Sequence, residues 1–184
     1  MRTFLAGVLC LGALSVGVLS VTAISAYAAS LPRKAADLQI QMNGAKPIEL
    51  SQYHGKPVVL AFILTTCSHC QYTTGLLVKL QTEFVSKGLQ VIVCAVNDGA
   101  ATELPSFIKR FQTNFPVGYS TDQVGVLSFL QHPQTAIPHM PMLAFIDRRG
   151  VIREQYQGID ALLSDEATQE ENLRAEIVKL IAIR

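Results

Sequence analysis

Two cysteines separated by two residues, Cys67 and Cys70, stand in the stretch TTCSHC directly after a run of apolar residues. Thiols at this spacing can form a disulfide, bind a soft metal ion or lie buried as small apolar side chains. A structural disulfide that closes so short a loop would add little stability, because the entropic benefit grows with the length of chain enclosed. The spacing therefore favours a chemically active pair.

The N-terminal residues indicate the compartment in which this pair works. A single charge at Arg2 is followed by an apolar stretch from Phe4 to Ala23 and by the small-residue triplet Ala26-Tyr27-Ala28, the layout of a secretory signal. The apolar stretch is also long enough to remain in a bilayer as an anchor. Residues 1–28 are thus expected to be a signal peptide, or alternatively an N-terminal membrane anchor, and the protein to be periplasmic or secreted. Disulfides persist in such compartments.

The remainder of the 184-residue chain is expected to fold as one domain over residues 38–184, preceded by a linker at residues 29–37. Its formal charge is 0, because removing residues 1–28 takes one Arg and no acid from a net +1. With no basic cluster, no nucleic-acid partner is expected. The third cysteine of this part, Cys94, lies in the apolar segment LQVIVCAV and is expected to be a small buried side chain.

Hydrophobic patterning predicts the elements that position the pair. An N-terminal hairpin is expected from 38–41 and 48–50, with its turn at Asn43-Gly44, and buried strands at 57–64, 89–96, 115–119 and 142–147, the last with an antiparallel partner after a turn at 148–150. A first helix is expected from the cysteine pair to Gly88, and a second over 101–112 with Pro105 near its first turn. A third is expected to begin at Thr121 or Asp122, with Val124, Leu127 and Leu130 inward. The last is expected over 162–183 with a cap at Ser164. This order predicts an α/β fold with a mixed sheet between helical layers.

The predicted helix start gives the two thiols different roles. Cys67 would sit near unpaired backbone N–H groups and the positive end of the helix dipole, which favour a thiolate and make it the candidate nucleophile. Cys70, one turn later and more deeply buried, would resolve a mixed disulfide formed at Cys67. His69 would stabilise the thiolate further if protonated, or else project into solvent.

At this point the sequence resembles the exported thioredoxin-fold thiol-disulfide oxidoreductases of the TlpA-like and AhpC/TSA (redoxin) group. The resemblance rests on IELSQYHGKPVVLAFILTTCSHC, on NDG after the second buried strand, and on HMPMLAFIDRRGVI, and it spans about residues 38–158. It implies a thioredoxin-like mixed sheet flanked by helices, with the N-terminal hairpin as an extension. It also implies a redox disulfide between Cys67 and Cys70 and roles in antioxidant defence and cell redox homeostasis.

By the same resemblance, Pro141 corresponds to a cis-proline opposite the thiols, and Met140 pairs its backbone with an extended substrate. Thr66 and Ser68, which flank Cys67, are expected to contact substrate as well, and Thr65, Tyr72, Asn97 and Asp98 to shape the cleft. Substrates would be exported protein thiols or disulfides. A membrane or periplasmic redox partner would regenerate the pair, and no cofactor and no metal would be needed.

The chain departs from the group's pattern at several positions. Thr66 replaces a tryptophan, Gly75 replaces a helix-kinking proline, and Ala61 and Thr73 occupy the places where a proton-relay carboxylate usually stands. A buried general base therefore cannot be carried over. His69, Thr66 or water could transfer the proton instead, and the direction of electron transfer is not encoded in these residues.

Two other functions compete with this interpretation. A thiol peroxidase would use Cys67 as the peroxidatic residue, but the peroxiredoxin motif requires a proline and a threonine where this sequence has Leu60 and Leu64. A copper(I) delivery protein would combine the two cysteines with His139, Met140 and Met142 as soft ligands. Disulfide exchange is the function that the motifs favour most.

Overall fold

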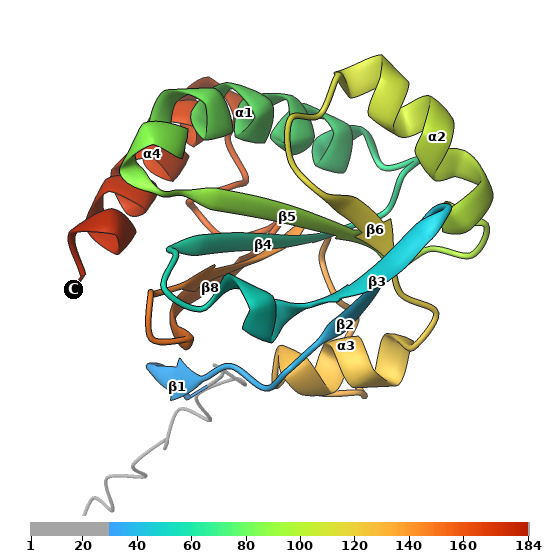
Figure 1. The fold of residues 1–184 in the computed structure, drawn as a ribbon, viewed down its shortest axis with the longest axis horizontal. Helices are drawn as coiled ribbons and strands as arrows, with labels where there is room; N and C mark the ends of the chain where they lie inside the picture. Colours follow the sequence, from blue (N-terminus) through green and yellow to red (C-terminus); the bar gives the residue numbers. More distant parts are fainter. Residues whose placement is uncertain (1–29, 184) are drawn as a thin grey trace, which may run out of the picture.

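The computed structural model describes residues 30–183, and the predicted signal or anchor at residues 1–28 lies outside them. Its strands are β1 (Arg33–Lys34), β2 (Gln39–Met42), β3 (Ala45–Glu49), β4 (Val58–Ile63), β5 (Gln90–Ala95), β6 (Val117–Tyr119), β7 (Met142–Ile146) and β8 (Val151–Gln157). Its helices are α1 (Ser68–Phe84), α2 (Ala100–Phe111), α3 (Gln123–Phe129) and α4 (Glu166–Ala182), with short 3-10 segments η1 (Leu50–Tyr53) and η2 (Val85–Lys87). The strands form one mixed sheet in the order β1-β8-β7-β4-β5-β6-β2-β3 (Figure 1).

The central strand β4 is buried on both faces, as its continuous apolar run predicts. Alternate side chains enter two separate cores: Val59, Ala61 and Ile63 pack with α1, α2 and α4, whereas Val58, Leu60 and Phe62 pack with α3. Figure 1 shows the same division, with α1 and α4 over one face of the sheet and α3 under the other. The predicted α/β class, a mixed sheet between helical layers, is confirmed.

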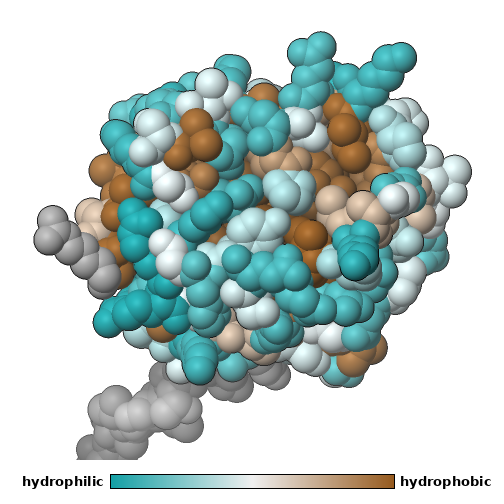
Figure 2. Space-filling view, viewed as in Figure 1, coloured by the Kyte–Doolittle hydropathy of each residue, from teal (hydrophilic) through white to brown (hydrophobic). Residues whose placement is uncertain are grey.

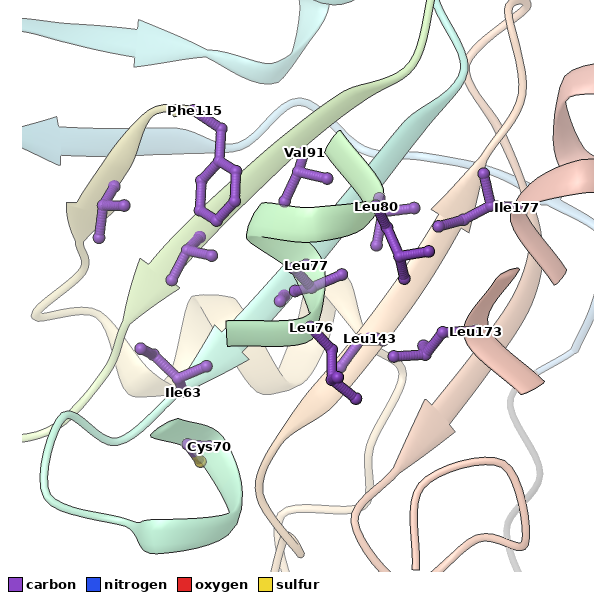
Figure 3. Packing of buried hydrophobic residues seen from close by; sticks show 14 of the residues in the cluster. Ile63, Cys70, Leu76, Leu77, Leu80, Val91, Phe115, Leu143, Leu173 and Ile177 are labelled. Atoms are coloured by element: carbon purple, nitrogen blue, oxygen red, sulfur yellow. The ribbon is translucent and has the colours of Figure 1, made fainter. Parts of the chain in front are cut away.

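The larger core joins α1 and α4 to each other and to the face of the sheet that both helices cover. Leu76 and Leu80 of α1 lie beside Leu143 of β7 and beside Leu173 and Ile177 of α4 (Figure 3). These side chains are at most 4% exposed. Since α1 carries both cysteines at its N-terminal end, this packing fixes the position of the pair relative to the sheet.

Strand pairing brings the ends of β4 and β7 together. β4 runs parallel to β5 and antiparallel to β7, with Phe62 opposite Met142. The segment that follows β4 and the segment that precedes β7 therefore lie at the same end of the sheet. These are the two segments that contain the predicted site residues.

The predicted N-terminal hairpin is confirmed, and it extends the sheet at β6. β2 and β3 pair around the turn at Asn43-Gly44, and Gln41 of β2 pairs antiparallel with Tyr119. Gly118 permits this close approach, because a Cβ there would lie 2.6 Å from Cγ2 of Ile40. The hairpin also reaches α2, as Asn43 Nδ2 donates a 2.6 Å hydrogen bond to the carbonyl of Ala101.

That bond explains how α2 tolerates Pro105. The sequence places this proline near the first turn of its helix, but it is the sixth residue of α2, where its missing N–H leaves the carbonyl of Ala101 without an intrahelical donor. The side chain of Asn43 supplies the donor. The helix begins one residue earlier than expected, so Pro105 lies in its second turn, and a contact distant in sequence supplies the missing donor.

Three other expectations differ from the structure. Part of the expected linker forms β1, in which Arg33 and Lys34 pair with β8. The last helix begins at Glu166 with Asp165 as its cap, not at residue 162 with Ser164, because the Asp165 carboxylate accepts the N–H of Ala167 at 3.0 Å. In α3 the side chains that point inward are Val126 and Phe129, followed by Leu130, while Val124 is 59% exposed.

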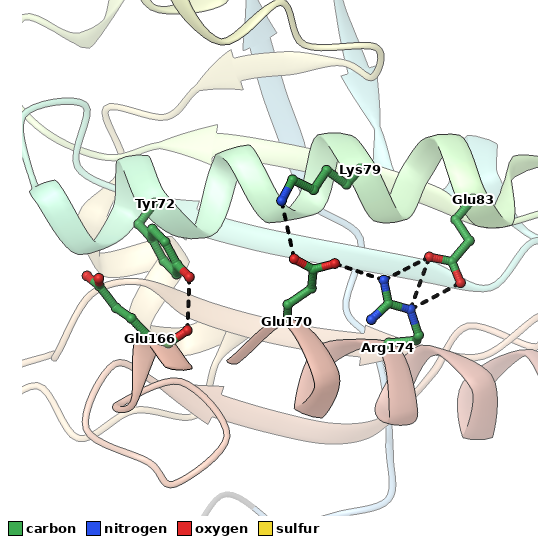
Figure 4. A network of polar contacts seen from close by, with 6 residues as sticks. All are labelled: Tyr72, Lys79, Glu83, Glu166, Glu170 and Arg174. Carbon is green, nitrogen blue, oxygen red and sulfur yellow. Dashed lines mark hydrogen bonds and ion pairs between the residues drawn. The ribbon is translucent and has the colours of Figure 1, made fainter. Parts of the chain in front are cut away.

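Polar contacts complete the junction of α1 and α4. Glu170 pairs with Lys79 and with Arg174, and Arg174 also pairs with Glu83, so one network ties the two helices along their length (Figure 4). On the face seen in Figure 2, hydrophobic residues lie in small groups between hydrophilic ones. Within residues 30–183, no helix is both long and apolar enough to cross a membrane.

Candidate redox site

Cys67 is the N-cap residue of α1. Its backbone is extended (φ −76°, ψ 122°), its N–H donates to the carbonyl of Leu64 at 3.1 Å, and its sulfur accepts the backbone N–H of Cys70 at 3.4 Å. Cys67 is partly buried, and its neighbours Thr66 and Ser68 are exposed. A sulfur held at a helix N-terminus with a backbone donor directed at it is arranged for negative charge.

Cys70 is one helical turn further along and is fully buried. Burial raises the pKa of its thiol far above the ordinary range, and the neighbouring Cys67 adds to the shift. Both residues are free cysteines, as is Cys94. The pair is therefore asymmetric: one thiol can be reached from outside, and the other is shielded and retains its proton.

Cys94 behaves as the sequence predicts. It is 0% exposed in β5, and burial raises the pKa of its thiol to about 12. Its sulfur belongs to the core that β4 shares with α3, on the opposite face of the sheet from Cys70. A protonated, enclosed thiol of this kind is a packing residue.

His69 does not project freely into solvent, which was one of its two expected orientations. Its ring is half-buried, and Nε2 lies 2.9 Å from the carbonyl oxygen of Leu163 in the segment before α4. A carbonyl can only accept, so Nε2 carries the hydrogen. Tyr72 contacts the same region, since its hydroxyl donates to the carbonyl of Glu166 at 2.9 Å (Figure 4). The first turns of α1 are thereby attached to the start of α4.

The loop that leads into Cys67 is held by a polar cluster at the ends of β4 and β5. Asn97 Oδ1 accepts the N–H of Thr65 at 2.9 Å, and Gln71 Nε2 donates to the carbonyl of Thr65 at 2.8 Å. The carboxylate of Glu103 in α2 accepts from the Thr65 hydroxyl and, at 3.0 Å, from Asn97 Nδ2. Thr65 and Asn97 were expected to shape the cleft, whereas Gln71 and Glu103 were missed.

Pro141 lies directly before β7, at the same end of the sheet as this loop. The Met140–Pro141 peptide bond is cis, as expected from the resemblance, and Pro141 is buried while Met140 is half-buried. Gly158 supports the segment from the other side, because its N–H donates to the carbonyl of His139 at 2.7 Å. A Cβ at Gly158 would lie 2.5 Å from the carbonyl oxygen of Met140, so only glycine fits there without displacing Met140.

The two places where the group usually carries a carboxylate are neutral. Ala61 is fully buried in β4. Thr73 is also buried, donates to the carbonyl of His69 at 2.9 Å and accepts from Gln169 Nε2 at 2.8 Å. Gln169 reaches this position from α4, and its Oε1 is buried without a partner in the part of the chain that the structure describes. One of the two places thus holds a methyl group, and the other holds a hydroxyl that is hydrogen-bonded to an amide, so neither is ionisable.

The site residues predicted from the sequence fall into two groups at one end of the sheet. Thr66, Cys67, Ser68, His69 and Cys70 lie at the start of α1, with Thr66 and Ser68 exposed beside Cys67. Met140 and Pro141 lie directly before β7, which pairs with β4. The roles of Thr66, Ser68, His69, Met140 and Pro141 toward a substrate remain predictions.

The copper alternative would need His139 close to the two cysteines. Across residues 30–183, however, no three side chains drawn from His, Cys, Asp and Glu are near enough to one another to hold a metal ion. His139 is exposed, and its backbone N–H lies 3.5 Å from Gln157 Oε1. The His and Cys ligands envisaged for copper are therefore not assembled.

Comparison with known proteins agrees with this description of the site. Residues 31–155 match the AhpC/TSA family. Thiol-disulfide oxidoreductase ResA of Oceanobacillus iheyensis is 30% identical over 129 residues, which cover 67% of this chain and 64% of the relative. ResA of Bacillus subtilis is 32% identical over 90 residues, which cover 48% of this chain and 49% of that protein. The matched region thus spans less than two thirds of the length of either relative.

Solved structures resemble the whole domain. A thiol:disulfide interchange protein of the thioredoxin family from Chlorobium tepidum superposes with a TM-score of 0.67 at 18% identity, covering 84% of this chain and 100% of that chain. The thioredoxin domain of a thiol-disulfide oxidoreductase from Bacteroides vulgatus also gives 0.67 at 18% identity, covering 84% and 99%. The predicted thioredoxin-like fold is confirmed.

Proposed function

The chain belongs to the AhpC/TSA family, and we propose that it is an exported thiol-disulfide oxidoreductase that exchanges disulfides with protein substrates through Cys67 and Cys70. The observation that carries this proposal is the asymmetry of the pair. Cys67 is accessible at a helix N-terminus, and Cys70 is shielded one turn away with a raised pKa. One thiol is placed to meet a substrate and the other to resolve the intermediate.

The exchange proceeds in two balanced steps. The thiolate of Cys67 attacks one sulfur of a substrate disulfide, which forms a mixed disulfide and releases the other substrate sulfur as a thiolate. Cys70 then loses its proton and attacks the sulfur of Cys67, which releases the second substrate thiolate and leaves a Cys67–Cys70 disulfide. The substrate gains two electrons and the pair loses two. The reverse sequence oxidises a substrate dithiol.

Removing the proton from Cys70 is the demanding step, because its thiol is buried and Ala61 and Thr73 occupy the two usual places of a proton-relay carboxylate. The substrate thiolate released in the first step, or water, accepts this proton in our scheme. His69 holds the start of α1 against the segment before α4 through Leu163, which makes it a positioning residue.

We assign substrate docking to Met140 and Pro141, together with Thr66 and Ser68 on either side of Cys67. In this proposal an extended substrate chain pairs with the backbone of Met140, which is half-buried and lies two residues before β7. A membrane or periplasmic redox partner restores the pair after each cycle. We also propose that residues 1–28 direct the export of the protein.

A variant series tests the two cysteine roles. In Cys70→Ser the mixed disulfide at Cys67 cannot be resolved, so the variant should accumulate a covalent adduct with a disulfide-containing substrate, detectable by mass spectrometry and reversed by reductant. Cys67→Ser should form no adduct, and Cys94→Ser serves as the matched control, with wild-type exchange. An adduct on Cys70 in the Cys67→Ser variant, or none on Cys67 in Cys70→Ser, would overturn the assignment.

The peroxidase alternative has less support. Leu60 is fully buried in β4 and Leu64 carries no hydroxyl, so neither supplies the polar group that would position a peroxide. Peroxide consumption by wild type and by Cys70→Ser, measured beside the adduct assay, separates the two activities.

A further inference from the structure

The end of the sheet opposite the redox site carries a group of cations. Lys56 precedes β4, Lys87 precedes β5, and Arg148 and Arg149 belong to the turn between β7 and β8. Lys34 belongs to β1, which pairs with the start of β8. Figure 1 shows the two loops and the turn at the same end of the sheet. We call these five residues, Lys34, Lys56, Lys87, Arg148 and Arg149, the basic face.

Hydrogen bonds hold the parts of the basic face together. The guanidinium group of Arg148 donates to the carbonyl of Gly55, which precedes Lys56, and to the carbonyl of Lys87, both at 3.4 Å. The N–H of Gly55 donates in return to the carbonyl of Arg148 at 2.8 Å. Lys34 and Lys56 line one cavity beside these loops. The cations therefore belong to one surface.

Most of the charge on this surface is not neutralised. Lys34 and Lys56 are exposed, and within residues 30–183 neither forms an ion pair. The acid of the β7–β8 turn, Asp147, is buried and pairs with Arg153 at 2.6 Å, so these two charges cancel. Asp37 is exposed and lines the cavity with the two lysines, so it offsets one cation of the basic face. An excess of positive charge remains.

The redox end of the domain has the opposite charge. Four segments connect the elements there, and none of them contains Lys or Arg: residues 64–78, 96–108, 120–141 and 158–173. Their acids include Asp98, Glu103, Asp122, Asp160, Asp165 and Glu166. An anionic surface would therefore attract the basic face and repel the redox end, which would orient the domain.

The basic face also lies close in sequence to the predicted signal or anchor. Five residues separate residue 28 from Lys34. A chain of this length spans at most roughly 20 Å, so an anchor retained at residues 1–28 would hold Lys34 within that distance of the bilayer. Val85, which is 57% exposed, lies two residues before Lys87. Cations beside exposed apolar side chains are typical of surfaces that bind anionic membranes.

We propose that the basic face binds the surface of a bilayer that contains anionic phospholipids. The ammonium and guanidinium groups donate to headgroup phosphates. The six residues of β4 then place the redox site roughly 20 Å further from the bilayer than the basic face, where soluble exported proteins can reach Cys67. The inference takes the exported location from the proposed function, but it does not use the chemistry of Cys67 and Cys70.

The lack of tryptophan in the chain permits a direct test, because a single introduced Trp is the only one that fluoresces. Val85→Trp places it at the basic face. Ile159→Trp places it at the redox end, where Ile159 is 59% exposed. Each full-length variant is reconstituted in vesicles of phosphatidylcholine, alone or mixed with an equal amount of phosphatidylglycerol, and energy transfer from Trp to a dansyl-labelled headgroup is measured.

The expected result is a difference between the two positions that depends on lipid charge. With phosphatidylglycerol present, transfer should be stronger from Val85→Trp than from Ile159→Trp, and this difference should be lost in phosphatidylcholine alone. It should also be lost at about 1 M salt, where the Debye length is only about 3 Å. Equal transfer from both positions in the anionic vesicles, or a difference that ignores lipid charge, would overturn the proposal.

Charge reversal locates the contact. Lys34→Glu and Lys56→Glu, combined in the Val85→Trp protein, should abolish the gain in transfer that phosphatidylglycerol produces. Single Lys56→Glu should reduce this gain. Lys46→Glu is its matched control, because it changes the net charge equally but lies on β3, at the sheet edge opposite β1. All three lysines are exposed, so the substitutions leave the core intact. An unchanged gain in the double variant would contradict the assignment of the basic face.

An acidic protein is the other partner that such a surface could bind. If phosphatidylglycerol has no effect but soluble polyglutamate protects the Val85→Trp fluorophore from iodide quenching, the partner is a protein and the lipid proposal is overturned. Failure of the proposed function looks different, because disulfide exchange is assayed separately on the same proteins. Loss of exchange with an intact response to phosphatidylglycerol rejects the oxidoreductase proposal alone.

Discussion

Cys67 and Cys70 differ in their surroundings more than in their chemistry. The sulfur of Cys67 caps a helix and accepts a backbone N–H, while that of Cys70 is enclosed by the core that joins α1 to α4. This difference sets the order of the two reaction steps. The more exposed sulfur of Cys67 meets the substrate first, and the shielded sulfur of Cys70 resolves the mixed disulfide without competing for the substrate.

The protonation of Cys70 predicts how the reduction potential depends on pH. Because burial raises the pKa of this thiol, reduced Cys70 keeps its proton through the neutral and mildly alkaline range, and each two-electron reduction takes up at least one proton. The potential should therefore fall by about 30 mV per pH unit or more between pH 6 and pH 9, one tenfold change in proton activity being worth about 30 mV for two electrons.

Redox titration against a dithiol buffer at several pH values measures this slope. Cys94→Ser should reproduce it, since Cys94 lies on the opposite face of the sheet. A slope near zero within that range would mean that both thiols are ionised in the reduced protein, contrary to the raised pKa of Cys70.

At the residue scale, the reacting groups are easier to predict from the sequence than the groups that hold them in place. The two cysteines and Pro141 are recognisable from local motifs. Glu103 is 38 residues from Thr65, and Leu163 is 94 residues from His69, so both contacts depend on the folded chain. The position of Glu103 in the first turn of a predicted helix was the available signal for it, because acids are favoured there.

Among the elements, the segment before β7 depends on a single residue, Gly158, for its position. Gly158 at the end of β8 approaches the Met140 carbonyl so closely that Gly158→Ala must push Met140 away. We expect a loss of about 1–3 kcal/mol in the free energy of unfolding, as for other overpacked sites, together with slower disulfide exchange, because Met140 is the proposed docking residue.

Gly75 provides the control within α1. A Cβ at Gly75 would meet no atom within 4 Å, so Gly75→Ala should raise the free energy of unfolding by about 0.5–1 kcal/mol through the better helix propensity of alanine. Urea unfolding and an exchange assay on both variants check these expectations. Equal effects of the two substitutions would show that the contact between Gly158 and Met140 does not matter.

The hairpin and α2 are coupled through Asn43. Asn43→Ala removes the donor to the Ala101 carbonyl, the group that Pro105 leaves without an intrahelical partner, and should lower the free energy of unfolding by about 0.5–1.5 kcal/mol. In a Pro105→Ala background the helix N–H can bond that carbonyl, so the same substitution should cost less. A double-mutant cycle with no coupling between the two positions would contradict this account.

Patterning predicts elements well where one period dominates and poorly at their ends. The apolar run of β4 and the spacing of leucines in α1 are unambiguous. The seven-residue α3 is too short to define a face, which is why Val124 was placed inward. Ser164 and Asp165 are both good caps, and the choice between them depends on the bond that Asp165 makes to Ala167.

For the molecule as a whole, the sheet order explains why the site lies where it does. β4 stands in the middle of the sheet, between β5 and β7, so the loop after β4 and the segment before β7 meet at one end of the domain. The fold class follows from the order of the predicted elements. The docking of the hairpin on β6 and of β1 on β8 does not, because both are long-range pairings of short edge strands.

The central claim is that Cys67 and Cys70 form one reversible two-electron couple. Equilibrium titration of the purified protein with a glutathione or dithiothreitol redox buffer, followed by alkylation and intact-mass measurement, tests it most directly. We predict a single transition in which wild type and Cys94→Ser gain or lose two thiols together, and no intramolecular transition in Cys67→Ser or Cys70→Ser. A wild-type protein in which Cys67 and Cys70 remain separate thiols across the whole range of potentials would contradict the account.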